Sequence, residues 1–332
     1  MKRYTAMLVL GLLLVSCGKN TTFFKNEGLV FGTIYHFTYE ADKDLDEEVK
    51  KVMNDFNMSL STYQENSVIS KINRNQSMET DEYFRTVFNK AKEITAATEG
   101  AFDMTVAPLV NAWGFGFSNK DSVTTALIDS LMEDVGMDMV ELKEGIIVKQ
   151  RPGIMLDASA IAKGYAVDVV ADYLESKGVN NYMVEIGGEM RVKGSNPKGL
   201  NWKVGIDKPI DDPEVLERQL QEIISISNVA LATSGNYRNF YLKDGKKYAH
   251  TISPYTGYPV VHQLLGVSVL APDCMTADAY ATAFMVLGVE KGMKIVENNP
   301  DLEAYFISAG TDGNEYEITL TEGFKKVIES VE

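Results

Sequence analysis

The stretch that decides the fold is residues 157–193, DASAIAKGYAVDVVADYLESKGVNNYMVEIGGEMRVK. Ser159 is the predicted N-cap of a helix, because a serine hydroxyl can accept a hydrogen bond from a backbone N–H of the first turn. The helix is expected to end near Lys177, since Gly178 suits the position just past a helix end. A strand-like run follows at 182–193. A helix therefore leads directly into strand structure.

Gly187 and Gly188 interrupt that strand-like run. Paired glycines in a strand indicate either a β-bulge or a close approach of the backbone to a ligand. A bulge without a ligand is the commoner case, so these residues by themselves leave both interpretations open.

Helices and strands are mixed irregularly on both sides of this stretch. One-sided apolar patterns predict helices at 42–58, 81–98, 276–287 and 290–298. Strands are expected at 31–40, 202–207, 223–232 and 265–271, with hairpins turning at Glu144-Gly145, Asp244-Gly245 and Asp312-Gly313. Regular βαβ alternation is lacking, so we expect an α+β fold of mixed sheets and packed helices. No linker composition divides 28–332, which is predicted to be a single domain, either one compact unit or two lobes.

The N-terminus has the features of a lipoprotein signal. A positively charged start precedes an apolar run that is too short to span a bilayer. Leu14-Val15-Ser16-Cys17 then matches a lipobox, with an ordinary signal peptide beside a chance cysteine as the alternative. We expect residues 1–16 to be a signal peptide, Cys17 to carry the lipid and 17–27 to form a tether. The mature protein is accordingly expected to be membrane-anchored outside the cytoplasm, on the periplasmic side.

Charge and cysteine usage exclude several classes of function. The net charge is -15, whereas binding to a nucleic-acid backbone requires basic patches. Cys274 is the only cysteine besides Cys17, so no structural disulfide is expected. The three histidines lack the spacing of a zinc site.

The predicted helix at 276–287 could hold a cation. Asp278 and Thr282 are four residues apart and share a helix face, and the small Ala281 lies beside them. Ligands that are all oxygens suit a hard cation, Mg²⁺ before Zn²⁺. The alternative is a plain capped helix, in which Thr276 is the cap and Asp278 interacts with the helix dipole.

A second motif could hold an anion. Asp157 ends a strand-like run, and Lys163 falls in the first turns of the following helix. Exposed N–H groups at a helix N-terminus bind phosphate, and the lysine could reach the same group. A capped helix with a surface lysine is the alternative.

Two further segments could act on a ligand. His250 precedes a loop rich in proline and glycine, where its near-neutral pKa would suit a base. It could equally be a structural hydrogen-bonding histidine. Aromatic residues among glycines at 100–116 suit either a planar ring or a packed corner of the core.

The order of these motifs resembles the ApbE family, the FAD:protein FMN transferases. The similarity runs from Phe31 to about Gly288, which is most of the mature chain. The matching blocks are 60–63, 67, 100–103, 108–116, 157–166, 186–188, 234–235, 250–259 and 277–283.

The resemblance implies an α+β fold that binds FAD in a cleft, with Mg²⁺ at the pyrophosphate. It implies metal ligands at Asp278, Thr282 and the backbone carbonyl of Ala160, with a backbone contact from Ala281. It also implies that His250 is the catalytic base. Lys163 would add positive charge at the same phosphate.

The FAD contacts implied by the resemblance are Phe31, Tyr63, Ala101, Phe102, Asp103, Asp157, Lys163 and Ile252. The sequence departs from the family pattern at two of the positions compared. Phe31 stands where the family commonly has methionine, and Ser253 stands where it usually has Asp or Asn.

The function implied is Mg²⁺-dependent transfer of FMN from FAD to a threonine hydroxyl of a target protein, with release of AMP. The implied acceptors are subunits of Na⁺-translocating quinone reductase or Rnf-type redox complexes. An FAD pyrophosphatase that uses water instead of threonine needs the same residues. A non-catalytic FAD-binding lipoprotein would need neither a metal nor a base, and a purely structural envelope lipoprotein would make the motif set coincidental.

Overall fold

The computed structural model describes residues 21–116, 123–210, 219–236, 240–243, 246–310 and 316–329. The predicted signal peptide 1–16, Cys17 and the turns Asp244-Gly245 and Asp312-Gly313 lie outside the described residues. The predicted tether is wrong for residues 22–27. They form part of a strand, Thr22–Val30, that pairs with the next strand along its whole length.

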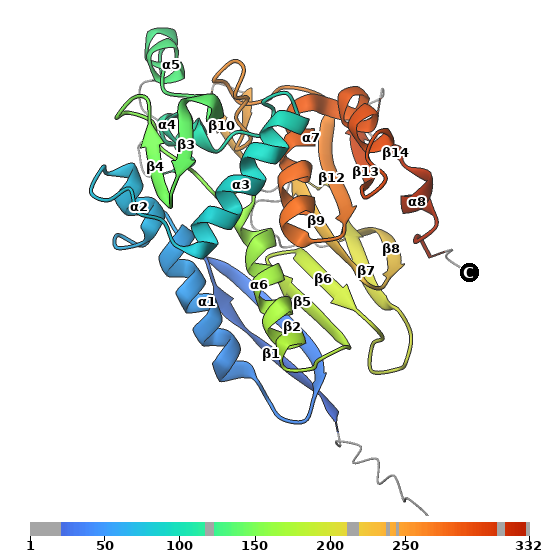
Figure 1. Ribbon diagram of the computed structural model, residues 1–332. Helices are drawn as coiled ribbons and strands as arrows, with labels where there is room; N and C mark the ends of the chain where they lie inside the picture. The colour runs from blue at the N-terminus through green and yellow to red at the C-terminus, as the bar shows by residue number, and fades with distance from the viewer. Residues whose placement is uncertain are drawn as a thin grey trace, which may run out of the picture.

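Antiparallel strand pairs dominate the fold. The strands of the main sheet are β1 (Thr22–Val30), β2 (Thr33–Ala41), β5 (Tyr182–Ile186), β6 (Glu189–Lys193), β9 (Val229–Gly235), β12 (Leu264–Ala271), β13 (Glu303–Ala309) and β14 (Tyr316–Leu320). They lie side by side in the order β1-β2-β5-β6-β9-β12-β13-β14 (Figure 1). The small pairs are β3 (Val140–Lys143) with β4 (Ile146–Lys149), β7 (Trp202–Asp207) with β8 (Leu220–Ile226), and β10 (Phe240–Lys243) with β11 (Lys246–Ala249).

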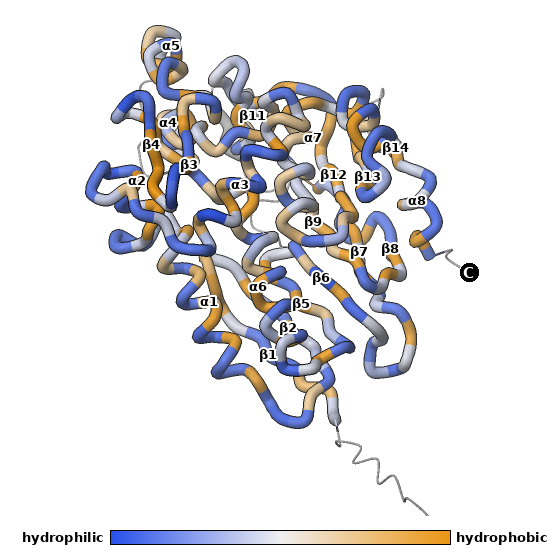
Figure 2. The backbone as a smooth tube through the Cα atoms, viewed as in Figure 1, coloured by the Kyte–Doolittle hydropathy of each residue, from blue (hydrophilic) through white to orange (hydrophobic). Residues whose placement is uncertain are grey.

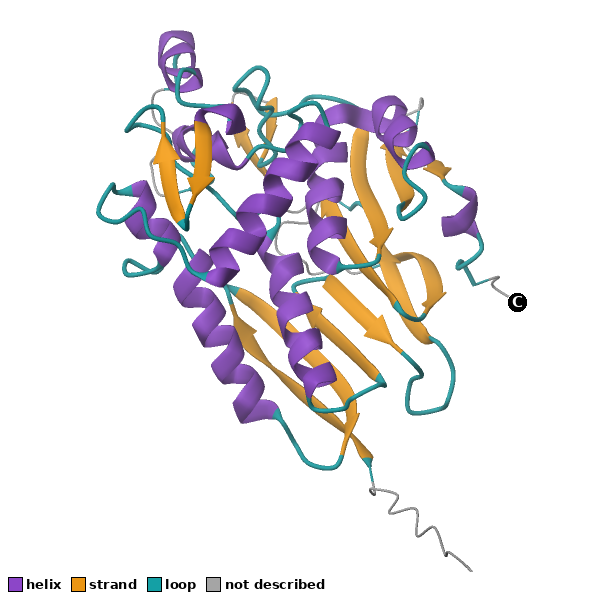
Figure 3. Cartoon of the chain, in the orientation of Figure 1, coloured by secondary structure: helices purple, strands orange, loops and turns teal. Residues whose placement is uncertain are grey.

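Helices form a layer on one face of the main sheet. The helices are α1 (Asp46–Leu60), α2 (Val68–Asn73), α3 (Glu82–Ala97), α4 (Ala107–Ala112), α5 (Thr125–Met132), α6 (Ala162–Ser176), α7 (Cys274–Glu297) and α8 (Glu322–Lys325). Phe324 of α8 packs instead into the core on the other face. Helices α6 and α7 lie directly on the sheet, with α1 and α3 beside them (Figure 3). Antiparallel sheets and helices together confirm the α+β prediction. Among the described residues, no helix is long and apolar enough to cross a membrane.

Both faces of the sheet are buried at β9, β12 and β13, which lie between two cores. Successive side chains of a strand point to opposite faces. On β13, Ala304 and Phe306 join the core under the helices, whereas Tyr305 and Ile307 join a second core beneath β7 and β8. Apolar and polar residues alternate along α1, as its one-sided burial requires (Figure 2). This apolar patterning is why the sequence predicts α1 and α3 closely.

Three local predictions are corrected by backbone geometry. Gly187 and Gly188, with φ of 63° and 103°, form the turn of the β5–β6 hairpin rather than a bulge. The strand expected at 223–232 is broken by a turn at Asn228, where φ is 55°, so β8 and β9 are separate strands. Ser159 is not the N-cap of α6, because the helix starts at Ala162 and its cap residue makes no side-chain hydrogen bond.

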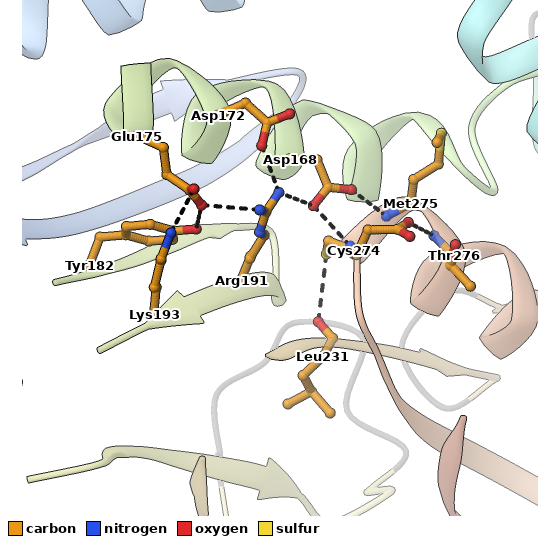
Figure 4. Close-up of polar contacts among 11 residues, drawn as sticks. Asp168, Asp172, Glu175, Tyr182, Arg191, Lys193, Leu231, Cys274, Met275 and Thr276 are labelled. Carbon is orange, nitrogen blue, oxygen red and sulfur yellow. Dashed lines mark hydrogen bonds and ion pairs between the residues drawn. The ribbon is translucent and has the colours of Figure 1, made fainter. Parts of the chain in front are cut away.

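The beginning of α6 is capped from another helix instead. The Asp278 carboxylate of α7 accepts a hydrogen bond from the Gly164 N–H at 2.9 Å. In return, Asp168 of α6 accepts hydrogen bonds from the N–H groups of Cys274 and Met275 at 2.9 and 2.8 Å (Figure 4). Each helix therefore satisfies backbone donors in the first turn of the other, which a helix cannot satisfy internally.

Gly164 allows this close crossing. A Cβ at this position would lie 2.7 Å from the Asp278 Cβ and even closer to the Cys274 carbonyl oxygen. Arg191 of β6 reinforces the crossing, because its guanidinium pairs with two carboxylates of α6. Its Nη1 lies 3.3 Å from Asp168 Oδ1 and 2.9 Å from Asp172 Oδ1. Burial raises the pKa of Asp168 to about 7, although the two N–H bonds and Arg191 oppose that rise.

We predict that Gly164→Ala destabilises the protein by about 1–3 kcal/mol, because the added methyl group overpacks the helix crossing. The control is Ser176→Ala, on the exposed last turn of the same helix, which should stay within about 0.5 kcal/mol of wild type. Urea unfolding measures both values. Equal stability of the two variants would show that the crossing tolerates a side chain.

Candidate functional site

The candidate site is a cavity of about 1220 Å³ that opens where the helix starts meet the main sheet. Its walls come from segments far apart in the sequence: the loop after α1, the 3₁₀ segment before α4, the start of α6, the β5–β6 turn, β7, the His250 loop and α7. The predicted site residues that line it are Tyr63, Ala101, Phe102, Asp103, Asp157, Ala160, Lys163, His250, Ile252, Asp278 and Thr282.

One wall of the cavity presents oxygen donors. Asp278 is 3% exposed, and the Thr282 hydroxyl lies 3.3 Å from the hydroxyl of Ser234 on β9. Ala160 lines the same cavity from the turn that precedes α6. No group of three or more His, Cys, Asp or Glu residues positioned to hold a metal occurs in the described parts of the chain. One carboxylate with hydroxyl and carbonyl oxygens suits a hard cation that takes its remaining ligands from phosphates and water.

Lys163 faces this wall and pairs with a residue that the sequence did not single out. Its Nζ lies 2.6 Å from Oε1 of Glu189, the first residue of β6. Burial lowers the pKa of Lys163, but the negative charges of Asp278 and Glu189 outweigh burial, so the pKa lies above its ordinary value. The lysine is therefore held as a cation.

His250 lines the cavity at the start of a loop with a defined shape. Within the loop, Ile252 forms an antiparallel β-bridge with Pro259. The Ser253 N–H donates to the Tyr258 carbonyl, and the Ser253 carbonyl accepts from the Gly257 N–H. The loop is tied to the body by the Trp113 Nε1–H, which donates to the Gly257 carbonyl at 2.7 Å. The backbone of Ser253 thus closes the loop although its side chain departs from the family pattern.

Aromatic and apolar groups line the other parts of the cavity. Tyr63 is 75% exposed at the edge, whereas Phe102 is almost fully buried. The ring of Phe115 lies edge-on to His250, with centroids 6.4 Å apart. Such surfaces are suited to a planar ring.

Asp103 and Asp157 have mainly structural hydrogen bonds. Asp103 accepts from the N–H groups of Thr105 at 2.7 Å and Met137 at 3.2 Å, and burial raises its pKa. Asp157 accepts from the Ser159 N–H at 2.8 Å, which shapes the turn before α6. Both side chains hold the cavity wall in place.

Two predicted site residues do not line the cavity. Phe31 occupies the tight β1–β2 turn with φ of 52°, and its ring lies on Phe56, with centroids 5.6 Å apart. Ala281 is fully buried inside α7. For Phe31, the structure thus shows an aromatic packing role at a position where the resemblance implied a flavin contact.

Glu189 was missed because its importance depends on a tertiary contact. The sequence signal was present: an acidic residue directly follows Gly187-Gly188 within the strand-like run 182–193. Buried carboxylates are rare unless they are paired. Only the fold shows that the partner is Lys163, 26 residues earlier in the chain.

Comparison with known proteins gives consistent matches. The model of the ApbE family matches residues 31–306. The FAD:protein FMN transferase of Vibrio cholerae serotype O1 is 39% identical over 310 residues, covering 90% of this chain and 92% of the relative. The protein of the same name from Haemophilus influenzae is 36% identical and covers 98% and 97%.

Solved structures agree with the sequence matches. The flavin transferase ApbE from Vibrio cholerae superimposes with a TM-score of 0.83 at 36% identity, covering 93% of this chain and all of that one. The apo form of the Pseudomonas stutzeri flavinyl transferase ApbE gives a TM-score of 0.81 at 30% identity, covering 92% and 97%.

Proposed function

This chain belongs to the ApbE family, and we propose that it transfers FMN from FAD to a threonine hydroxyl of a target protein in a Mg²⁺-dependent reaction. The observation that carries the proposal is one cavity that brings together Lys163, His250, Asp278 and Thr282 from three separate segments. Relatives named FAD:protein FMN transferase match nearly the whole chain. Transfer of FMN from FAD to a protein is thus the activity of this chain.

The oxygen-lined wall fits a magnesium ion. Asp278, Thr282 and the carbonyl of Ala160 would hold it, in keeping with the preference of Mg²⁺ for few protein ligands beside substrate phosphates. When bound, the ion would withdraw charge from the pyrophosphate during phosphoryl transfer. The buried helix crossing fixes the Asp278 carboxylate, because one of its oxygens already accepts the Gly164 N–H.

The remaining groups of the cavity would act on the phosphates and on the hydroxyl. Lys163 would place its positive charge at the transferred phosphate. His250 would accept the proton as the threonine oxygen bonds to the FMN phosphorus and the bond to AMP breaks. Tyr63 and Phe102 would flank the flavin ring. Products are a phosphoester-linked FMN and AMP.

We further propose that the protein is held on the membrane by lipid at Cys17, on the periplasmic side. The lipobox supports this placement. The acceptors we propose, subunits of Na⁺-translocating quinone reductase or Rnf-type complexes, would lie in the same membrane plane. A shared plane would shorten the search of the enzyme for an extended, exposed threonine segment.

We expect Asp278→Asn to lower FMN transfer by about 10²-fold or more, because the amide keeps the cap on α6 but loses the charge that holds the cation. Asp273→Asn on the same helix is the control, since an asparagine can still cap α7 through Thr276. Mass measurement of an acceptor subunit incubated with enzyme, FAD and Mg²⁺ reads out the transfer. Full transfer in EDTA would refute the metal assignment. FMN and AMP in solution without any labelled acceptor would favour the pyrophosphatase.

His250→Ala is expected to slow transfer by about 10²–10⁴-fold while FAD affinity stays near wild type, because a base acts on the proton rather than on the flavin. His262→Gln is the matched control, since His262 bonds to the Met285 carbonyl and does not line the cavity. Single-turnover rates and FAD titrations separate the two effects. A parallel loss of rate and affinity would make His250 a binding residue instead.

Cys17→Ser should release the protein from membranes or leave its signal peptide uncleaved, because the lipid is attached through the thiol. Membrane fractionation and intact mass measure the outcome, with Cys274→Ser as the control for the other cysteine. Unchanged membrane retention of a Cys17→Ser protein would argue against lipid anchoring.

A further inference from the structure

The tip of the β1–β2 hairpin carries two large apolar side chains that are exposed. Leu29 is 84% exposed and Ile34 is 50% exposed. The two residues are partners in the β1–β2 register, so their side chains lie next to each other on one face of the sheet. Tyr35 points to the opposite face and packs into the core under the helices. Leu29 and Ile34 therefore form an apolar pair on the face of the sheet that those helices do not cover.

The apolar pair continues directly into the cavity. Ile34 lines the cavity, and its carbonyl accepts a hydrogen bond from the Gly187 N–H at 2.9 Å. The β5–β6 turn, to which Gly187 belongs, lies at the same end of the sheet as the β1–β2 turn. Glu189 follows this turn and pairs with Lys163. The cavity wall thus runs from Ile34 across the β5–β6 turn to the lysine that is proposed to meet the transferred phosphate.

The length of this row fits a short extended polypeptide. The row crosses three strand spacings, from β1 over β2 and β5 to the start of β6, which amount to about 14 Å. An extended chain advances about 3.3 Å per residue, so about four residues span the row. A threonine beside Lys163 would place a residue about four positions away on the apolar pair.

The wall between the apolar pair and Lys163 is polar and well fixed. Glu185 of β5 accepts the Gly188 N–H at 2.5 Å through one carboxylate oxygen, and the other oxygen lies 2.6 Å from His36 Nδ1. His36 lies two residues after Ile34, on the same face, and lines the cavity. The backbone of an extended segment needs hydrogen-bond partners when it loses water, and the second ring nitrogen of His36 can supply one.

Two other occupants of the apolar pair fit less well. A lipid surface would be expected near Thr22, where the chain enters β1, whereas Leu29 lies about 23 Å further along the strand (Figure 1). A second copy of the chain would need about 800 Å² of buried surface on each partner, far more than two side chains supply.

We propose that the apolar pair of Leu29 and Ile34 docks the segment of the target protein that carries the reacting threonine. The segment is extended, and an apolar side chain about four residues from the threonine packs on the pair. This inference rests on the proposed function and deepens it, because transfer to a protein requires a polypeptide to reach the cavity. The pair sets the affinity for the acceptor, whereas residues inside the cavity bind FAD and carry out the transfer.

The test compares Leu29→Gln with Leu200→Gln. Leu200 is 58% exposed in the loop between β6 and β7, at the opposite end of β6 from the β5–β6 turn, so it gives the same change outside the row. Initial rates of FMN labelling are measured against the concentration of a Rnf-type acceptor subunit, with FAD and Mg²⁺ saturating. Leu29→Gln should raise the KM for the acceptor by about tenfold, the factor that burial of one leucine contact contributes. The maximal rate and the FAD affinity should stay near wild type, and Leu200→Gln should match wild type throughout.

Variants of the acceptor identify the side chain that packs on the pair. Serine replaces, one at a time, each apolar residue within about five positions of the threonine. One replacement should raise the KM by about tenfold with the wild-type enzyme and add little with Leu29→Gln, because both changes then remove the same contact.

Three results would overturn the inference. They are an equal KM for Leu29→Gln and Leu200→Gln, acceptor replacements that all add fully to Leu29→Gln, and loss of self-association or of vesicle binding in Leu29→Gln with an unchanged KM. The last result would assign the pair to a second copy or to a lipid surface. The proposed function fails separately, if the wild-type enzyme releases FMN and AMP but labels no acceptor subunit.

Discussion

The crossing of α6 and α7 is the interaction on which the rest of the structure depends. Two buried carboxylates, Asp168 and Asp278, each bond to N–H groups in the first turn of the opposite helix. Neither helix start could be buried without these bonds, because its N–H donors would lack partners. Gly164 lets the backbones approach closely enough for both bonds to form. The crossing also sets where the cavity lies, because Lys163 on the first turn of α6 and Asp278 near the start of α7 both line it.

The sequence predicts those parts of the fold whose burial is one-sided and local. The apolar stripes of α1 and α3 follow from periodicity, because the core covers only one face of each helix. Residues 22–27 of strand β1 read as a tether in the sequence, because pairing with β2 and not composition makes them part of a strand. The cap of α6 could not be read locally, since its acceptor lies 114 residues further along the chain.

The sequence predicts which residues share the cavity better than it predicts how their charges pair. Motif order and residue chemistry single out Lys163, His250, Asp278 and Thr282, and the fold places all four on one cavity. Phe31 does not line the cavity, because its turn directs the ring against Phe56. The sequence could not show that Lys163 pairs with Glu189, because that ion pair depends on the distance between side chains on separate elements.

Asp278 serves the fold and the cavity at once, and this has a consequence for protein turnover. Because the carboxylate that caps α6 also lines the cavity, ligand occupancy and global unfolding are linked equilibria: whatever binds only the folded chain lowers its unfolded population by mass action. The lifetime of the folded protein should therefore follow flavin supply. Chains that lack ligand would spend more time open to proteases, so the amount of enzyme would adjust to its substrate without a dedicated regulator.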